Sequence, residues 1–476
     1  MRIAMVTSEV NPFSKTGGLA DVVFALSKDL QKLDQEVVIV CPFYGSINRS
    51  MLGEDYKLVA TYNVQLDWRT QEARVFEIKH AGLTYYFIEN EYYFSRHSMY
   101  SYDDDSERFA FFTLASEQLF PYLNLPVDII HIHDWQAGML PMRIKEGKSH
   151  YDFYKNTKFV LSIHNPAFQG LFNVEDLGGF YNLAHSYGDN PYLRVNGQIS
   201  SLKAAIMYVD KLNTVSPTHA LELLTPEGGK GLESVIALRG KDFSGILNGI
   251  DYEEFNPESD ALIAKNFGKT TIKSGKKGNR NALFTMFNLP KTTAPIYAIV
   301  SRLTWQKGID LILAGANYIL DRGGVFLVLG SGEYETENAF KDLAAKYPNQ
   351  VGLYIGYSNE IAHALYAGAD FFMMPSLFEP CGSGQMIAFR YATLPLVRYT
   401  GGLKDTVVGY DGTNLKVANG FGFADYNIDK MVETVKLSYD VYEQKDIFHQ
   451  LQKNAFNENN DWSQSAQRYL NLYEQI

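Results

Sequence analysis

The sequence has very little cysteine and no long apolar run. Its two cysteines, Cys41 and Cys381, lie far apart in the chain, so no disulfide framework is expected and a reducing, cytoplasmic setting is favoured. No apolar stretch approaches the ~18 residues needed to cross a membrane. The N-terminus has one arginine and a short apolar segment, which is typical of a strand rather than a signal peptide. These absences argue against a membrane partner.

An excess of positive charge is also absent. The chain has 476 residues, with 43 Lys and Arg against 54 Asp and Glu, and a net charge of −11. This balance disfavours nucleic acid as a partner but leaves a neutral polymer open. The length predicts two or three domains. Most of the 32 Tyr and 30 Phe side chains should form a large core, and exposed tyrosines could stack on sugar rings.

Segments typical of strands alternate with segments typical of helices in both halves of the chain, which indicates an α/β fold with parallel sheets. Residues 56–89 differ, because three closely spaced strands there indicate an antiparallel meander. We expect a domain boundary near residues 241–245, an exposed basic connection at 270–280 and a docked terminal helix at 461–476. The other expected strands are Ile3–Thr7, Glu36–Cys41, Asp128–His133, Phe159–His164, Lys211–Val215, Ile296–Val300, Val325–Leu329, Val351–Ile355, Phe371–Met374 and Leu394–Val397.

A glycine-containing loop from Ser14 to Asp21 follows the first expected strand and precedes a helix. The turn at Gly17 and Gly18 lets the backbone approach a ligand closely, and the N-terminus of the helix favours an anion. Lys15 adds a positive charge to the same loop. The loop matches neither the dinucleotide-binding pattern nor the P-loop pattern. We therefore expect a phosphorylated ligand that is bound in another way.

A basic loop follows the first strand of the second half, at the end of the sheet where parallel α/β folds bind ligands. Arg302 and Lys307 lie five residues apart on this loop. Arg can grip phosphate oxygens with two donors and Lys acts as a point charge, so the pair could neutralise a leaving diphosphate. The alternative is a solvated basic loop without a ligand.

A second loop, which contains Glu379, follows a later strand of the same half. Glu379 could bind a sugar hydroxyl or stabilise developing positive charge, and the alternative is an interaction with the dipole of the next helix. Gly382, Ser383 and Gly384 offer backbone N–H groups to a phosphate. Cys381 has no partnered base in the sequence, so we expect a small buried thiol rather than a nucleophile.

Histidines gather after two strands of the first half. His131, His133 and Asp134 end one strand, while His164 and Asn165 end the next. A metal site is disfavoured, because His131 and His133 point to one face of a strand and Asp134 points to the other. At a strand end beside an amide, His164 is better suited to a sugar hydroxyl than to the core.

Together these motifs resemble the bacterial glycogen synthases, the class of retaining α-1,4-glucosyltransferases that includes the plant starch synthases. The resemblance covers essentially the whole chain, and its specificity comes from the order and spacing of the motifs. They are KTGGLAD at Lys15–Asp21, HDW at His133–Trp135, IHN at Ile163–Asn165, LNGID at Leu247–Asp251, SRLTWQKG at Ser301–Gly308, FEPCG at Phe378–Gly382 and PLVRYTGGLKDTV at Pro395–Val407.

The resemblance implies a GT-B architecture, with two Rossmann-like domains facing a central cleft. The N-terminal, glucan-side domain would comprise residues 1–243 plus 458–476, and the nucleotide-sugar-binding domain residues 244–457. The implied reaction transfers glucose from ADP-glucose to the non-reducing end of an α-1,4-glucan such as glycogen, with retention of configuration, release of ADP, and no metal or prosthetic group. No motif supplies the carboxylate nucleophile of a retaining glycosidase. The resemblance implies a front-side route instead, in which the leaving phosphate accepts the acceptor proton.

The resemblance also implies a role for each motif residue. Arg302 and Lys307 would neutralise the diphosphate, and Tyr357 would stack on adenine. Carried over by position, the catalytic set is Glu379, His164, Arg302, Lys307 and Asp134, and the donor-binding set is Lys15, Gly17, Gly18, Asn165, Asn248, Tyr357, Cys381, Gly382, Ser383 and Gly384.

The chain departs from the family pattern in two places. Ser383 and Gly384 stand where many members have Leu and Thr, and Gln136 stands where many have His. None of these changes removes a charge that the chemistry needs. Two alternatives remain open, a UDP-sugar-dependent transferase of the same fold and a glucan-binding protein that has lost catalysis. A phosphorylase is disfavoured, because no lysine motif for pyridoxal phosphate is found.

Overall fold

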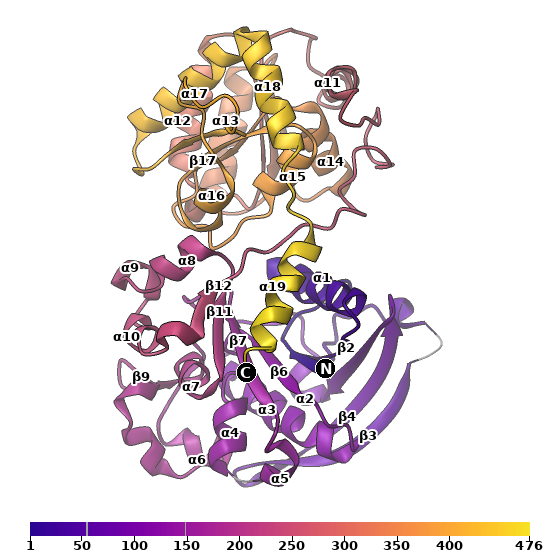
Figure 1. The fold of residues 1–476 in the computed structure, drawn as a ribbon, viewed down its shortest axis with the longest axis vertical. Coiled ribbons are helices and arrows are strands. Elements are labelled where there is room, and N and C mark those ends of the chain that lie inside the picture. Colours follow the sequence, from indigo (N-terminus) through magenta and orange to yellow (C-terminus); the bar gives the residue numbers. More distant parts are fainter. Residues whose placement is uncertain (54–55, 148) are drawn as a thin grey trace. The chain divides into compact units, whose positions relative to one another are not determined.

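The computed structural model describes residues 1–53, 56–147 and 149–476 (Figure 1). The contacts of the chain divide it into two compact units, Met1–Asn248 with Trp462–Ile476, and Gly249–Asp461. Each unit has its own sheet and its own hydrophobic core. The chain therefore passes between the units twice, after residue 248 and after residue 461. Within the described ranges, no helix is long and apolar enough to cross a membrane.

The first unit contains a nine-stranded sheet with the order β12-β11-β7-β6-β1-β2-β5-β4-β3. Neighbouring strands are parallel except at β3–β4 and β4–β5, so the antiparallel meander predicted for residues 56–89 is confirmed. The strands are β1 (Arg2–Val6), β2 (Glu36–Pro42), β3 (Lys57–Leu66), β4 (Arg69–His80), β5 (Leu83–Glu89), β6 (Ile129–His133), β7 (Lys158–Ile163), β11 (Lys211–Thr214) and β12 (Phe243–Gly245).

Helices and a small second sheet complete this unit. The small sheet has the order β8-β10-β9, from β8 (Leu171–Phe172), β9 (Arg194–Val195) and β10 (Gln198–Ser200). The helices are α1 (Gly18–Lys32), α2 (Glu91–Phe94), α3 (Asp105–Tyr122), α4 (Leu140–Gly147), α5 (Tyr151–Tyr154), α6 (Asp176–Tyr181), α7 (Ser201–Tyr208), α8 (Pro217–Glu222), α9 (Pro226–Gly229), α10 (Glu233–Ala237) and α19 (Trp462–Tyr473), with 3-10 turns η1 (Arg49–Leu52), η2 (His185–Asp189), η3 (Pro191–Leu193) and η4 (Gly240–Asp242).

The central strands β1 and β6 of this sheet are buried along most of their length, and their residues are apolar except for Arg2, His131 and His133. Residues 3–6 of β1 and all of β6 are inaccessible to solvent, as expected for parallel strands that helices cover on both faces. The terminal helix α19 packs beside α1 and buries Trp462, Tyr469 and Tyr473 in the core (Figure 1). The docked terminal helix predicted for residues 461–476 is therefore confirmed.

The second unit contains a six-stranded parallel sheet with the order β15-β14-β13-β16-β17-β18. The five strands predicted for this half are confirmed, and β18 is an additional one. The elements are β13 (Ile296–Val300), β14 (Val325–Gly330), β15 (Val351–Ile355), β16 (Phe371–Met374), β17 (Leu394–Arg398), β18 (Phe421–Phe423), α11 (Ile272–Met286), α12 (Ile309–Asp321), α13 (Tyr334–Lys346), α14 (Asn359–Gly368), α15 (Gly384–Arg390), α16 (Gly401–Thr406), α17 (Ile428–Glu443), α18 (Lys445–Phe456) and the 3-10 turn η5 (Trp305–Lys307).

The exposed connection predicted for residues 270–280 is wrong, because these residues form most of the helix α11. The helix buries Ile272, Gly275, Lys276 and Asn279, a spacing that places them on one face. A side chain at Gly275 would collide with the ring of Phe267, so this glycine permits close packing rather than chain flexibility.

Candidate active site

The carboxyl ends of the strands in the second unit form a pocket of about 200 Å³. Lys307 and Glu379 meet there, with Nζ of the lysine 2.5 Å from Oε2 of the glutamate. Ser376 donates a further hydrogen bond to the same oxygen at 3.0 Å. The pocket is lined by Val300, Ser301, Arg302, Lys307, Ile312, Tyr366, Met373, Met374, Ser376, Glu379, Gly382, Ser383 and Gly384. The structure thus brings together most of the residues predicted from the two loops of this half.

Arg302 is the second cation of this pocket. Its side chain is exposed, and it makes no ion pair or hydrogen bond with the part of the chain that the structure describes. Lys307 is instead held by Glu379, which is only 8% exposed. One cation is therefore fixed by a buried carboxylate, while the other is available to an anion.

The Gly401-Gly402 pair resembles the first glycine loop in sequence but has a structural task. A Cβ atom on Gly401 would lie 2.0 Å from the carbonyl oxygen of Glu379, and one on Gly402 would lie 2.3 Å from that of Cys381. The N–H of Gly402 donates to the carbonyl of Pro380 at 3.1 Å. These glycines allow the backbone to support the Glu379 loop. The thiol of Cys381 is buried, as expected.

Of the two remaining predicted residues of the second unit, Ser383 lines the pocket and Tyr357 is not part of its lining. Tyr357 follows β15 and is 77% exposed, so one face of its ring is open to a stacking partner. Ser383 lies immediately before α15, which begins at Gly384. The backbone at residues 382–384 therefore reaches the pocket at the start of a helix.

In the first unit, Asp134 organises the ends of two neighbouring strands. Its backbone is left-handed, with φ of 57°, and its Oδ1 accepts the backbone N–H groups of His164 (2.7 Å) and Asn165 (3.3 Å). Burial raises the pKa of Asp134 to about 7, against the opposing effect of these two hydrogen bonds. Asp134 therefore fixes the backbone of the His164 loop.

The side chains of three histidines, His131, His133 and His164, contact one another in sequence at these strand ends. The rings of His131 and His133 are 4.2 Å apart, and Nδ1 of His133 lies 3.1 Å from Nε2 of His164. Burial lowers the pKa of His131 and of His164 to about 3 and that of His133 well below its usual range, so all three rings are neutral at pH 7. Among the described residues no group of His, Cys, Asp and Glu side chains is arranged to hold a metal ion.

The glycine loop of the first unit is held by a buried carboxylate, Glu9. Its oxygens accept the N–H groups of Thr16 (2.6 Å) and Gly17 (3.2 Å) and the hydroxyls of Thr16 (2.6 Å) and Tyr100 (2.9 Å). Lys15 lies outside this arrangement and pairs with Asp21 at 2.7 Å. The N–H of Gly17 is thus already used, although the space beside Gly17 and Gly18 is open for a ligand.

Two amides complete the set in this unit. Oδ1 of Asn165 accepts the N–H of Ala167 at 3.1 Å, which shapes the loop after β7. Oδ1 of Asn248 is buried and has no hydrogen-bond partner among the residues described. A buried acceptor without a partner is costly, so this oxygen is suited to a ligand donor.

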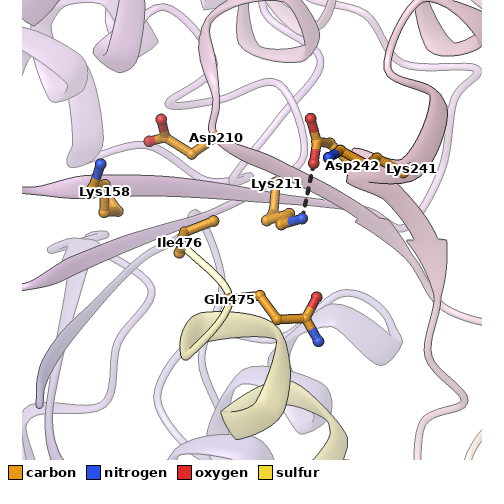
Figure 2. Close-up of a pocket in the computed structure, with 7 residues that line it drawn as sticks. All are labelled: Lys158, Asp210, Lys211, Lys241, Asp242, Gln475 and Ile476. Carbon is orange, nitrogen blue, oxygen red and sulfur yellow. Dashed lines mark hydrogen bonds and ion pairs between the residues drawn. The ribbon is translucent and has the colours of Figure 1, made fainter.

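A cavity of about 600 Å³ lies at the amino ends of strands in the nine-stranded sheet of the first unit (Figure 2). Its lining comes from the amino ends of β7, β11 and β12 and from the end of the chain, namely Lys158, Asp210, Lys211, Lys241, Asp242, Gln475 and Ile476. Lys211 is neutralised by Asp242, with 2.8 Å between Nζ and Oδ1. Parallel α/β sheets bind ligands at the carboxyl ends of their strands. This cavity is therefore not the candidate site.

Sequence reasoning did not assign Glu9, Tyr100 or His133 to the site. The local signal for Glu9 was a carboxylate between the first strand and the glycine loop. Tyr100 reaches Glu9 from a distant segment, and His133 reaches His164 from a neighbouring strand. Such contacts depend on tertiary pairing and leave no local pattern.

Comparisons with known proteins identify the family of this chain. A family model for the starch synthase catalytic domain matches residues 2–238, and one for group 1 glycosyl transferases matches residues 284–457. The glycogen synthase of Anoxybacillus flavithermus is 42% identical over 100% of this chain and 98% of its own length. That of Clostridium kluyveri is 40% identical over 100% of both chains.

Solved structures give the same result. The catalytic domain of starch synthase IV from Arabidopsis thaliana, bound to ADP and acarbose, superposes with a TM-score of 0.91 and 29% identity over 99% of this chain and 98% of that one. A sucrose-phosphate synthase from Thermosynechococcus elongatus, 15% identical with a TM-score of 0.61 over 100% of this chain and 98% of its own, shares the fold alone. The chain therefore belongs to the glycogen and starch synthase family of glycosyltransferases and has their GT-B fold.

Proposed function

We propose that this glycosyltransferase moves glucose from ADP-glucose to the non-reducing end of an α-1,4-glucan, with retention of configuration and release of ADP. The observation that carries the proposal is the pocket of the second unit, where Arg302 and the Lys307–Glu379 pair lie beside the start of α15. A related starch synthase with ADP and acarbose bound supports the same classes of donor and acceptor.

In this proposal the second unit grips the diphosphate. Arg302 and Lys307 supply two positive charges, and the backbone N–H groups of residues 382–384 supply further donors. Because Lys307 already contacts Glu379, the phosphate shares the lysine with that carboxylate. Tyr357 stacks on the adenine ring through its exposed face.

The first unit contributes the groups that hold the sugar. His164 and Asn165 offer side-chain polar atoms, and Asn248 offers its unpartnered oxygen. Asp134 shapes the loop that carries His164 and Asn165. Lys15 and the open backbone at Gly17 and Gly18 approach the diphosphate, and Glu379 binds glucose hydroxyls from the second unit.

The chemical step needs no nucleophile from the protein. The bond between C1 of glucose and the phosphate oxygen breaks, and a bond from C1 to the acceptor 4-oxygen forms on the same face. The acceptor hydroxyl gives its proton to the departing phosphate oxygen. Catalysis then consists of positioning and of neutralising the leaving group, which Arg302 and Lys307 do without a metal or prosthetic group.

The test is nucleotide release by the purified protein with ADP-glucose or UDP-glucose, each with and without a glycogen primer. We expect primer-dependent release of ADP and entry of labelled glucose into the polymer. A preference for UDP-glucose would overturn the donor assignment but keep the mechanism. If the protein binds glycogen but releases no nucleotide from either donor, it is a non-catalytic glucan-binding protein and the proposal is wrong.

A further inference from the structure

The proposed function gives no task to His133, although this side chain contacts His164 directly. His133 is inaccessible to solvent at the end of β6, and its Nδ1 lies 3.1 Å from Nε2 of His164. The contact follows from strand pairing, because β6 and β7 are parallel neighbours with His133 opposite Ser162. The direction of this hydrogen bond decides which nitrogen of the His164 ring carries the proton.

The direction of this hydrogen bond has two possibilities. Both rings are neutral at pH 7, and a neutral imidazole has one N–H donor and one bare acceptor nitrogen. Either His133 donates from Nδ1 to His164, or His164 donates from Nε2 to His133. In the first case Nε2 of His133 is a bare acceptor and Nδ1 of His164 carries a proton. In the second case Nε2 of His133 carries a proton and Nδ1 of His164 is bare.

The other nitrogen of His133 decides between them. Its Nε2 is buried and has no hydrogen-bond partner within the described ranges. If His164 were the donor, this Nε2 would carry a buried N–H without an acceptor, and orphaned N–H groups are the rarer kind of unsatisfied group. If His133 donates from Nδ1, its Nε2 is only a bare acceptor. The N–H without a protein partner then lies on Nδ1 of His164, a half-buried side chain, instead of on the inaccessible Nε2 of His133, so the geometry favours His133 as the donor.

The state of His164 then follows. Its Nε2 accepts from His133, so its proton lies on Nδ1. The side chain is half-buried, and Nδ1 has no hydrogen-bond partner in the part of the chain that the structure describes. Asp134 already fixes the backbone N–H of the same residue at 2.7 Å. The backbone and the ring of His164 are thus restrained by two different side chains.

We propose that His133 is a positioning residue that holds His164 in the Nδ1–H form, so that His164 presents a fixed N–H donor to one hydroxyl of the donor sugar. The sugar part of this inference rests on the proposed function. The restraint itself does not, because it concerns the protein alone. A neutral donor suits a neutral hydroxyl, and a ring fixed in advance avoids an ordering cost when the sugar binds.

The first test is the tautomer of His164 in the full chain labelled with 15N-histidine, with its signals identified by their loss in His164→Gln. We expect a protonated Nδ1 and a bare Nε2 in the wild type. His133→Phe keeps a ring but removes the donor, so the Nε2–H form should appear. His133→Asn has an amide that can donate in place of Nδ1 and should restore the wild-type pattern. His131→Asn, a buried neighbour that does not hydrogen-bond to His164, should leave it unchanged.

The wild-type spectrum decides the direction even if His133→Phe fails to fold. A protonated Nε2 in the wild type would overturn the inference, as would an unchanged tautomer in folded His133→Phe. A wild type with the expected tautomer that transfers no glucose from ADP-glucose would defeat the proposed function and leave the restraint standing.

The second test is kinetic. His133→Phe should lower kcat/KM for ADP-glucose about tenfold, the effect of losing one well-placed hydrogen bond. The same comparison is then made with analogues of ADP-glucose that each lack one glucose hydroxyl. For one analogue the wild type and His133→Phe should have the same kcat/KM, because this analogue lacks the hydroxyl that His164 binds. His133→Asn should recover the wild-type discrimination. An equal loss with every analogue would indicate a general structural role and would contradict the proposal.

Discussion

The contact between Lys307 and Glu379 is the most directly testable one in the second unit. Lys307→Ala removes the fixed cation of the pocket and leaves Ser376 as the remaining donor to Oε2 of Glu379. Because the lysine neutralises charge that develops on the leaving diphosphate, we expect kcat with ADP-glucose to fall by about 100-fold or more. Turnover is measured as primer-dependent ADP release.

The matched control is Lys341→Ala, which removes an exposed lysine of α13 on the same unit. It should leave kcat within about twofold of the wild type, since exposed ion pairs contribute little. Near-normal turnover by folded Lys307→Ala would remove this residue from its role.

Glu9 should control donor affinity through the glycine loop. Its carboxylate accepts from Thr16, Gly17 and Tyr100, whereas the amide of Glu9→Gln would turn an N–H toward one of these donors. The mismatch leaves buried donors unsatisfied, at a cost of about 1–3 kcal/mol, and loosens the loop. We expect the KM for ADP-glucose to rise about tenfold with a smaller change in kcat.

Glu36→Gln is the control for this substitution, because Glu36 is exposed and pairs only with Arg2 among the described ion pairs. Its kinetics should match those of the wild type. If Glu9→Gln folds and keeps the wild-type KM, the loop does not depend on the carboxylate.

The sequence predicted residues at this scale where chemistry and position coincide. Arg302, Lys307 and Glu379 come directly after strands, and the structure brings them to one pocket. His133 was not assigned because its partner, His164, lies on another strand. Glu9 was not assigned although Thr16 and Gly17 are only seven and eight residues away, and only its contact with Tyr100 comes from a distant segment. A motif identifies the residues of a site, but the side chains that contact them from neighbouring strands depend on how the strands pair.

At the scale of elements, α11 shows why local composition can mislead. Its glycines and lysines predict an exposed connection, yet Gly275 packs against Phe267 and Lys276 is buried. The tertiary contact of α11 with α14 overrides a weak helix propensity. The strand that follows, β13, was predictable, since a continuous apolar run is typical of a buried parallel sheet. The short strand before it, β12, has no such run and was not predicted.

Lys276 provides a pH test of this packing. Its Nζ donates to Oγ1 of Thr393 at 2.5 Å, and burial lowers the pKa of Lys276 to about 7. In the unfolded chain the pKa is near 10.4, so between about pH 7 and pH 10 the unfolded state binds a proton that the folded state has lost. This group therefore makes the free energy of unfolding rise with pH across that window.

Lys276→Met removes this titration and keeps most of the buried volume. We expect its free energy of unfolding, measured in urea from pH 7 to pH 9, to vary less with pH than that of the wild type. The two slopes should differ by at most about 1.4 kcal/mol per pH unit, the effect of one proton. Lys277→Met, on the exposed side of α11, should keep the wild-type slope. Identical slopes for Lys276→Met and the wild type would show that the buried amine does not titrate in this range.

At the scale of the whole molecule, the proposed site residues are divided between the two units. His164, Asn165 and Lys15 belong to the first unit, and Arg302 and Lys307 belong to the second. One ADP-glucose that uses both sets must contact both units. The chain passes between the units only after residue 248 and after residue 461.

Ligand binding should therefore draw the units together and exclude water from the reacting groups. We expect the radius of gyration, measured by small-angle scattering, to decrease when saturating ADP and a maltooligosaccharide are added. Lys307→Ala should show a smaller decrease at the same ligand concentrations, because it weakens the grip of the second unit on the diphosphate. An unchanged radius in the wild type, with both ligands shown by calorimetry to be bound, would mean that the two sets of residues already meet without a closing motion.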